Sequence, residues 1–443
     1  MIDAMPYEKL GAGNDGNIHQ KLGIEPVYSE ARMPKTSNEG TQLDVSEAVS
    51  VRRDFMPLQV RTVRAWNELE AIRPAWEKTM QAAQALTIFS TLEWLGAWWK
   101  AFAKDKELVA PVFSNSDGEI VGVVPLYIDL VETTFPFRVR RLRFVGDGSE
   151  DSDNLDLIIR AGYETSCSQA FLSWLGSNPD WDICELNTLP LDSAALPSLI
   201  SDLMRRRWTF RRLESPRTTI LLPDTWEIYL EQAISKKEKT KISYYTNRLP
   251  KHFQVSITKC DDVKDLPAAL ATLFGLHQKR WELKGGPGAF SSLERCELYY
   301  NMAPTFAERG WLEFWILKLD GKPAAVQFGF RYRNSVYSLQ EGFDPAYSSE
   351  RVGYVLRAHV LKTLIGQGVR QYDFLGGDEQ SKVRWGAQIG SYTDIHFARP
   401  MTRGSIFLRI DQTTRALKRW FRTNLPAPVL RAIPKGKSSV TPF

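Results

Sequence analysis

The chain has 443 residues, which is enough for two or three domains of about 150 residues each. Its composition, 43% hydrophobic and 25% charged residues, is that of an ordinary globular protein. The net charge of +5 is too small for this length to indicate nucleic acid as the main ligand, because nucleic-acid-binding domains concentrate basic residues in a stripe.

Metal sites and membrane spans are not indicated by the sequence. The four cysteines have no C-x-x-C spacing, and the five histidines form no H-x-x-x-H or H-E-x-x-H pattern. No stretch approaches about 18 consecutive apolar residues, and the N-terminus lacks the apolar segment of a secretory signal. We therefore expect a cytoplasmic protein with reduced thiols and no bound metal.

The globular part of the chain is expected to begin after a leader. Residues 1–55 are rich in polar residues without hydrophobic periodicity, which predicts a disordered segment. Further on, Ser90-Thr-Leu-Glu93 predicts a capping box at the start of a helix, with Ser90 as the cap. Asp117-Gly118 lies between two apolar runs and predicts a hairpin.

The rest of the first half alternates strands with helices. The expected strands are 141–145, 155–159, 181–186 and 218–222, and the expected helices are 166–175 and 196–205. An acidic loop, 146–153, follows the first of these strands.

A long helix is predicted to begin at Asp224 or Thr225 and to become basic in its second half. The basic residues are Lys236, Lys237, Lys239, Lys241, Arg248 and Lys251. This helix either contacts the phosphates of an anionic substrate or of RNA, or it presents a solvated charged face.

The second half continues with two helices, three strands and a further helix. The expected helices are 266–281, 293–309 and 351–365, and the expected strands are 312–319, 324–332 and 335–341. Asp320-Gly321 predicts a hairpin between the first two strands.

The stretch from Gln371 to Ala387 is the densest cluster of potentially reactive groups. It begins as a strand, breaks at Gly376-Gly377, and then carries Asp378 and Lys382 before Trp385-Gly386. A strand that opens into a glycine-rich charged loop can present reactive groups at a sheet edge. The alternative is a solvated turn.

The two halves share a pattern that predicts an internal duplication. Each has a strand, an Asp-Gly turn and a second strand, and each later has a Phe-x-Gly segment, Phe144-Val-Gly146 or Phe374-Leu-Gly376. In the second half, about thirty residues leave room for a crossover helix before the last strand. In the first half, 131–139 is too short for one, so only the second copy is expected to hold an anionic cofactor at a helix N-terminus.

The motifs resemble the CelD/BcsL family of GNAT-type acyltransferases, which is close to the Fem-type aminoacyl transferases. In the second half the matching segments are Lys236–Lys241, His277–Trp281, Gly342–Tyr347 with Gly353, Tyr372–Asp378 and Lys382–Gly386. In the first half they are Phe89–Trp94 with Trp98-Trp99, Val124–Leu126 and Leu142–Gly146. The family is associated with bacterial exopolysaccharide and cellulose gene clusters.

The resemblance implies an α/β fold of two tandem GNAT-like domains, each a mixed, mainly antiparallel sheet flanked by helices. The resemblance implies a non-catalytic GNAT-like domain over 56–222 and the acyltransferase domain over 223–400. A basic helix and tail, 401–443, would follow. The donor would be acyl-CoA, or an aminoacyl-tRNA as in the Fem relatives. The acceptor would be a small molecule or glycan precursor with an amine or hydroxyl, and no other nucleic acid is expected.

The resemblance places the donor's pyrophosphate at the start of the helix near residue 351, where free N–H groups and the helix dipole favour an anion. The residues concerned are Ser348, Ser349, Arg351, Val352, Gly353 and Tyr354. The usual loop begins with Gln or Arg and ends in Gly or Ala, whereas Glu350 and Val355 stand here. This departure leaves open a non-catalytic accessory protein with a decayed donor site.

Four residues are candidates for catalysis: Glu341, Asp373, Asp378 and Lys382. A base must remove the acceptor's proton, and a carboxylate at a strand end can do so. The alternatives are that Asp378 caps the turn and that Glu341 pairs with Arg331 across strands. Lys382 fills the position of a functional lysine in the Fem-type pattern.

Arg280, Trp281, Arg331 and Trp385 are candidates for substrate binding, and His277 is expected to be structural. The C-terminal segment from Ser405 to Arg422 predicts a basic amphipathic helix. It either rests on an anionic membrane surface or docks on the domain with a solvated basic face.

Overall fold

The computed structural model describes residues 57–83, 86–132, 138–149, 151–283, 285–376 and 379–424. All of these belong to one compact unit, Val49–Phe443. The predicted disordered leader and the last residues of the predicted tail lie outside the described residues.

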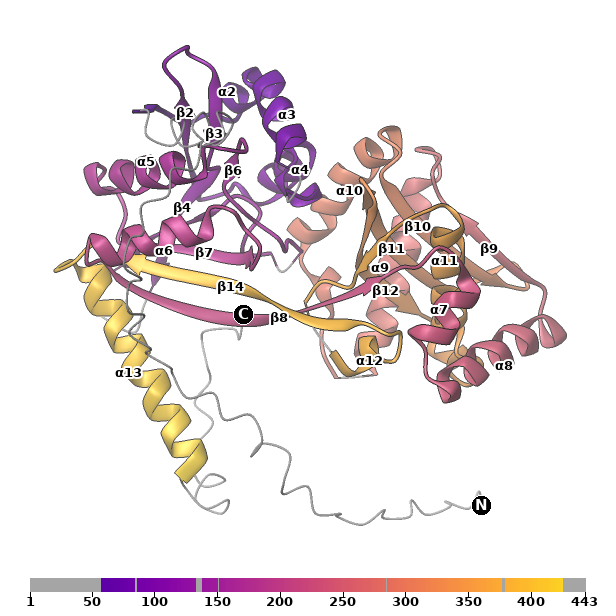
Figure 1. The fold of residues 1–443 in the computed structure, drawn as a ribbon. Helices are drawn as coiled ribbons and strands as arrows, with labels where there is room; N and C mark the ends of the chain where they lie inside the picture. The colour runs from indigo at the N-terminus through magenta and orange to yellow at the C-terminus, as the bar shows by residue number, and fades with distance from the viewer. Residues whose placement is uncertain are drawn as a thin grey trace, which may run out of the picture. The chain divides into compact units, whose positions relative to one another are not determined.

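The first half of the chain contains eight strands and five α-helices within the described residues (Figure 1). The strands are β1 (Gln59–Val63), β2 (Glu107–Ser114), β3 (Ile120–Val123), β4 (Leu126–Glu132), β5 (Arg138–Phe144), β6 (Ile158–Ile159), β7 (Ile183–Pro190) and β8 (Thr209–Leu221). The helices are α2 (Trp66–Ala71), α3 (Arg73–Ala82), α4 (Leu92–Phe102), α5 (Glu164–Ser177) and α6 (Leu196–Arg205), with a short 3₁₀ turn, η1 (Ile88–Ser90).

The second half continues the alternation of helices and strands. The helices are α7 (Trp226–Gln232), α8 (Lys236–His252), α9 (Leu266–Glu282), α10 (Leu293–Glu308), α11 (Val352–Gly366), α12 (Glu379–Val383) and α13 (Arg403–Asn424), with 3₁₀ turns η2 (Ala289–Ser291) and η3 (Pro345–Glu350). The strands are β9 (Val255–Lys259), β10 (Leu312–Leu319), β11 (Lys322–Tyr332), β12 (Ser335–Phe343), β13 (Gln371–Asp373) and β14 (Gln388–Ala398).

Fourteen strands of the described residues form one mixed sheet. Its order is β6-β3-β2-β4-β5-β7-β14-β8-β13-β12-β11-β10-β9, and β1 pairs with β2. The long strands β8 and β14 lie side by side and are antiparallel over eleven residue pairs, from Gln388↔Thr219 to Ala398↔Thr209 (Figure 1). β14 also pairs with β7, and β8 also pairs with β13, so these two strands join the halves into one sheet.

Two pairs of strands are parallel, and each encloses a crossover helix. β12 is parallel to β13 with α11 between them, as predicted. β5 is parallel to β7, and α5 lies between them in the chain. As predicted, the segment 131–139 is too short for a crossover helix, and β4 and β5 pair as adjacent antiparallel strands; the crossover of the first half comes one strand later, through α5.

The predicted Asp-Gly hairpins are both present. β10 and β11 are joined at Asp320 and Gly321, which have φ values of 50° and 79°. Positive φ at both central residues is typical of the tight turn whose twist suits a hairpin. β2 and β3 are joined across Gly118, whose φ is 77°. Turns of this kind are determined by adjacent residues, which is why the sequence predicts them correctly.

Two helix starts differ from the prediction. Thr91, not Ser90, caps α4 by accepting a hydrogen bond from the Trp94 N–H, because Ser90 belongs to the preceding 3₁₀ turn. The long basic helix is divided into α7, capped by Thr225, and α8, capped by Ser235. The Ser235 hydroxyl satisfies a free N–H group of α8, so the chain starts a new helix there.

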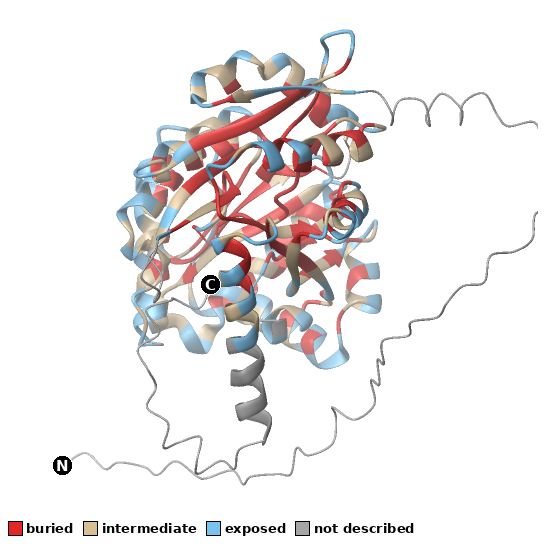
Figure 2. Cartoon of the chain, turned by 90° about the vertical axis from the view of Figure 1, so that its left-hand side faces the viewer, coloured by how far each residue is buried: buried red, intermediate tan, exposed pale blue. Residues whose placement is uncertain are grey.

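The core follows the sheet, with buried strands inside and helices whose outer faces are exposed (Figure 2). The largest apolar cluster contains residues from both halves of the chain. For example, the Trp94 ring of α4 stacks on Phe306 of α10 with their centres 6.2 Å apart. The α/β class with a mixed, mainly antiparallel sheet flanked by helices is confirmed, whereas the domain boundaries near 222 and 400 stay predictions.

The predicted C-terminal helix is present as α13. Its first part is docked: Leu408 is buried with Val139, Ile183 and Ala398. Arg403 pairs with Asp182 at 2.6 Å, and Asp411 pairs with Arg211. No helix of the described residues is both long and apolar enough to cross a membrane.

Candidate active site

A gap opens in the sheet between the parallel strands β12 and β13. They pair at only three positions, ending with Tyr337↔Asp373. β13 stops there, whereas β12 continues to Phe343. The register against β11 shifts beside Leu339, where Ser338 pairs with Gly329 and Gln340 with Phe328. An extra residue of this kind bends a strand, and among the described residues the end of β12 has no strand partner on the β13 side.

The end of β13 is fixed by a buried ion pair. Asp373 is fully buried, and its Oδ2 accepts hydrogen bonds from Arg217 Nε at 3.0 Å and Nη2 at 2.8 Å. Its Oδ1 accepts the Leu375 N–H at 2.8 Å. Burial raises the pKa of the Asp373 carboxyl, and Arg217 opposes that shift. Asp373 therefore anchors the loop that follows it.

Lys382 holds the same loop from the other side. Its Nζ donates to the carbonyl oxygens of Phe374 and Leu375, both at 3.0 Å, and to that of Gly376. Gly377 and Asp378 lie outside the described residues. The structure thus gives Lys382 a role in shaping the loop 374–376, beside any role toward a substrate.

A carboxylate from the first half of the chain meets this loop. Asp153, a half-buried residue of the acidic loop, accepts the Gly376 N–H through Oδ2 at 2.9 Å. Burial raises the pKa of Asp153 from its usual 3.8 to about 6. The nearby Asp373 charge also raises this pKa, whereas the hydrogen bond from Gly376 lowers it. Sequence reasoning noted the acidic loop but did not place Asp153 in the site.

The acidic loop is held in position by tryptophans of α4 and by α10. The indole N–H groups of Trp98 and Trp94 donate to Ser149 Oγ at 3.0 Å and Ser152 Oγ at 2.9 Å. Between them, Asp151 accepts from Arg295 Nε at 2.7 Å and from Tyr299 at 3.1 Å. The aromatic motif around Trp94 was a usable signal, because buried indoles need an acceptor.

The first turn of α11 offers free backbone donors. The N–H groups of Tyr354 and Val355 bond to the Arg351 carbonyl, whereas those of Val352 and Gly353 have no hydrogen bond among the described residues. Arg351 has a left-handed φ of 52°, and a Cβ on Gly353 would meet no atom within 4 Å. Free N–H groups beside open space at a helix start suit a phosphate.

The side chains around this turn are mostly engaged within the protein. Ser348 Oγ donates to the Pro345 carbonyl at 2.5 Å, and Ser349 Oγ contacts Glu350 at 3.5 Å. The Tyr354 hydroxyl donates to Glu238 at 2.8 Å. Of the six residues predicted to bind the donor, Val352 and Gly353 therefore offer backbone groups, and Arg351 is exposed.

Glu350, which stands where the GNAT pattern has Gln or Arg, is neutralised by α8. Its two carboxylate oxygens accept from Arg248 Nε at 3.1 Å and Nη2 at 3.3 Å. That hydrogen bonding lowers the pKa of Glu350. Val355 is buried. The departures from the pattern are thus compatible with an anion at the first turn of α11.

Glu341 and Arg331 do not pair with each other. Glu341 forms an ion pair with Arg357 of α11. Arg331 donates to the Gln367 side chain at 2.9 Å, at the end of the sheet where β11 and β12 meet in a hairpin. Arg331 lies opposite Val336 of β12, and Val336 is five residues, or roughly 17 Å, from Glu341 along that strand. Arg331 therefore lies away from the gap.

The remaining predicted residues surround the gap. Arg280 Nη1 lies 3.4 Å from the Glu341 carbonyl oxygen, and its guanidinium lies 5.9 Å from the Phe343 ring centre. Trp281 is 38% exposed and donates to His277 Nε2 at 2.9 Å. Trp385 is buried against Tyr354, with ring centres 4.5 Å apart, so it forms part of the wall rather than an exposed contact.

His277 is a neutral, structural histidine in this arrangement. Its Nε2 accepts the Trp281 N–H, and burial lowers its pKa to about 4. Among the described residues, no group of three or more His, Cys, Asp or Glu side chains could hold a metal ion.

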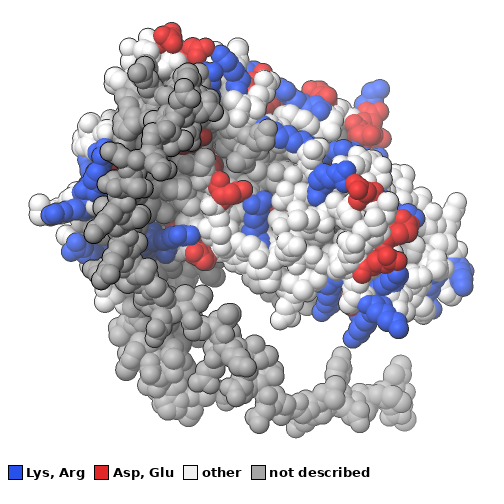
Figure 3. Space-filling view, viewed as in Figure 1, with Lys and Arg blue, Asp and Glu red and all other residues white. Residues whose placement is uncertain are grey.

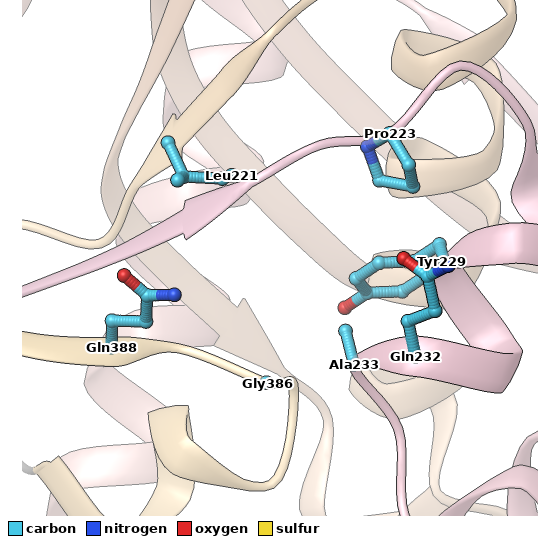
Figure 4. A pocket seen from close by; sticks show the side chains of 7 residues that line it. All are labelled: Leu221, Pro223, Tyr229, Gln232, Ala233, Gly386 and Gln388. Atoms are coloured by element: carbon cyan, nitrogen blue, oxygen red, sulfur yellow. The ribbon is translucent and has the colours of Figure 1, made fainter.

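A cavity of about 300 Å³ lies behind the loop that ends at Gly386 (Figure 4). It is lined by Leu221, Pro223, Tyr229, Gln232, Ala233, Gly386 and Gln388. No charged side chain lines it, and Tyr229 uses its hydroxyl to donate to the Trp385 carbonyl at 2.6 Å. The lining of this cavity offers no acid, base or nucleophile. The candidate site is therefore the gap between β12 and β13, together with the acidic loop and the loop 374–376.

Part of the second half is similar to a known protein family. Residues 236–383 match the family model described as an acetyltransferase (GNAT) domain. The match includes α8, the strands around the gap, α11 and Lys382. No curated protein sequence matches the chain.

Solved structures resemble the chain over both halves. The crystal structure of FemX aligns with a TM-score of 0.52 at 11% identity, covering 76% of this chain and 97% of FemX. A protein of unknown function from Bacteroides thetaiotaomicron aligns at 13% identity and a TM-score of 0.48, covering 78% of this chain and all of that one. A tandem GNAT protein from the clavulanic acid biosynthesis pathway aligns at 11% identity and a TM-score of 0.43, with coverage of 78% and 100%. At such identities the FemX likeness shows the fold alone.

Proposed function

We propose that the protein transfers an acyl group from an acyl-CoA to an amine or hydroxyl acceptor. The observation that carries the proposal is the contact of Asp153 with Gly376. It brings a carboxylate with a raised pKa to the loop held by Asp373 and Lys382, within the region that matches the GNAT model.

Asp153 is the base in this proposal. Asp373 is held by Arg217 and Glu341 by Arg357, whereas Asp153 accepts a hydrogen bond from the backbone N–H of Gly376. The acceptor's nitrogen or oxygen attacks the thioester carbonyl carbon, and its proton passes to the Asp153 carboxylate. The new C–N or C–O bond forms, the C–S bond breaks, and the sulfur leaves as the CoA thiolate, which then takes up a proton. A base with a pKa near the working pH suits this step.

The donor would lie along α11. The free N–H groups of Val352 and Gly353 and the helix dipole would bind its pyrophosphate, with Arg351 adding charge. Arg280 and Trp281 would face the acceptor. The first half would supply Asp153 and shape the acceptor side without binding a donor of its own.

Calorimetry with acetyl-CoA, and an assay for free CoA thiol with a panel of amino and hydroxyl acceptors, test the proposal. We expect acetyl-CoA to bind and thiol to be released with an acceptor. Absence of both would refute the proposal and favour an accessory protein of an exopolysaccharide system.

A second candidate, transfer from an aminoacyl-tRNA, is favoured by the surface of α8. Lys236, Lys237 and Lys239 are exposed in the first turns of this helix, where they oppose the helix dipole. Figure 3 shows Lys and Arg side chains in the region where Figure 1 places α8. Loss of activity on treatment with RNase would identify this donor, whereas a CoA enzyme would be insensitive.

The cellular role rests on sequence resemblance. The CelD/BcsL-like motifs lead us to propose a role in exopolysaccharide, cellulose or cell-envelope biosynthesis, with a glycan precursor as acceptor.

An acyl-CoA donor would place the reaction in the cytoplasm, and α13 would contact an anionic membrane. Co-sedimentation with anionic vesicles that is insensitive to removal of residues 401–443 would refute this role of the helix.

A further inference from the structure

Arg357 places a guanidinium at the closed end of the gap between β12 and β13. Its Cζ lies 4.7 Å from the centre of the Phe374 ring and 5.8 Å from that of Trp385. Phe374 directly follows Asp373, the last residue of β13 that pairs with β12. The charge therefore lies where the two strands part, between aromatic walls.

This guanidinium is largely withdrawn from water and has one carboxylate beside it. The Arg357 side chain is 12% exposed, and that of its partner Glu341 is 29% exposed. Nη2 donates to Glu341, whereas Nε and Nη1 have no hydrogen bond among the described residues. An arginine has five N–H donors, so most of these remain for a ligand. Burial lowers the pKa of Arg357, and a second anion would offset that cost.

The position of Arg357 on α11 relates it to the donor. Gly353 and Arg357 are four residues apart, so they lie on one face of the helix, about 6 Å apart along its axis. A donor whose phosphates bind at Gly353 can extend along this face into the gap. Its acyl end would then arrive near the point where Arg357 meets Phe374.

We propose that Arg357 makes the site selective for a donor whose acyl group ends in a carboxylate, such as a succinyl group, over an acetyl group. This inference rests on the proposed acyl-CoA donor. A carboxylate matches the planar guanidinium through two parallel hydrogen bonds. An acetyl methyl group would leave those N–H donors unpaired behind the walls of Phe374 and Trp385, which is unfavourable.

Calorimetric titration of the full chain with CoA, acetyl-CoA and succinyl-CoA tests this selectivity. We expect succinyl-CoA to bind about tenfold or more tightly than acetyl-CoA, since hydrogen bonds between charged groups are worth this much. Arg357→Met should abolish the preference while binding of CoA itself persists, and Arg357→Lys should keep part of it. The matched control is Arg370→Met, because Arg370 pairs with Asp224 at the surface.

The outcomes separate this inference from the proposed function. Equal affinity of the wild-type protein for the two acyl-CoAs would overturn the inference and leave the acyl-CoA donor in place, and this comparison requires no variant. A preference that persists in Arg357→Met would also overturn it. If Arg357→Met instead weakens the binding of acetyl-CoA and succinyl-CoA by the same factor, Arg357 does not distinguish the acyl groups and the inference is wrong. Failure of all three compounds to bind would overturn both proposals.

Discussion

Replacing Asp153 with Asn should lower activity and raise stability at neutral pH. The structure holds this carboxylate in a place where its charged form is unfavourable, since burial raises its pKa from 3.8 to about 6. A shift of that size corresponds to about 3 kcal/mol at pH 7. Solvent at a half-buried side chain screens part of it, which leaves about 1 to 2 kcal/mol. An asparagine removes the charge, and its Oδ1 can still accept the Gly376 N–H.

The sign of the pH dependence follows from the raised pKa. Below pH 3.8, Asp153 is protonated in both the folded and the unfolded chain, so wild type and Asp153→Asn should have equal stability. Between about pH 3.8 and 6 the unfolded chain ionises this carboxyl whereas the folded chain keeps its proton, so the wild-type protein loses stability over that window and the variant becomes the more stable. Above that window the difference should be constant.

Activity should change in the opposite direction. A general base contributes about 10²- to 10⁴-fold, so kcat/KM of Asp153→Asn should fall by that factor. The wild-type rate should rise with pH through about 6, and the variant should lack this limb. Urea unfolding at pH 4 and pH 7, together with the pH-rate profile, checks both effects. Equal stability at pH 7, or an unchanged acid limb in the variant, would refute the reasoning.

Three further predictions concern the parts around Asp153. Lys382→Ala should leave the chain folded but reduce transfer at least tenfold, because the loop 374–376 loses the donor to its carbonyls; circular dichroism and the thiol assay check this, and wild-type rates would contradict it. Trp94→Phe keeps an aromatic ring but removes the hydrogen bond to Ser152, so kcat should fall severalfold while KM for acyl-CoA is unchanged. A change in KM for acyl-CoA alone would be inconsistent with a role on the acceptor side. In Gly353→Asp the new side chain has open space and the helix dipole favours its negative charge, so thermal stability should be kept, while repulsion of the phosphates lowers acetyl-CoA affinity about tenfold. Gly353→Asn is the neutral control, and an equal loss of affinity in both variants would show that the size of the side chain is responsible and not its charge.

Features that depend on neighbouring residues were predictable from the sequence. The Asp320-Gly321 hairpin and the crossover helix before Tyr372 follow from turn chemistry and chain length, and the structure has both. The capping residue of α4 was displaced by one position because Ser90 closes a 3₁₀ turn, which hydrophobic spacing does not reveal.

The partners of the charged residues were not predictable, because they come from distant parts of the chain. Asp373 was expected as a base, but Arg217 of β8 neutralises it from 156 positions away. Glu350 departs from the GNAT pattern at the expected pyrophosphate site, but Arg248 of α8 pairs with it. The contact of Asp153 with Gly376 spans 223 positions and depends on the packing of both halves. Hydrophobic periodicity shows which face of a helix or strand is buried, and it carries no information about which other helix or strand packs against that face.

The way in which β8 crosses from one half to the other has a consequence for how this protein can be divided. The predicted domain boundary near residue 222 falls just after β8, which ends at Leu221. A fragment that begins at residue 223 would lack the strand that pairs with both β13 and β14, and with it Arg217. Its Asp373 would lose the ion pair with Arg217, and β13 would become an exposed edge. The half from residue 223 onward thus depends on a strand that the first half donates, and separating the halves at this boundary would leave its part of the sheet incomplete.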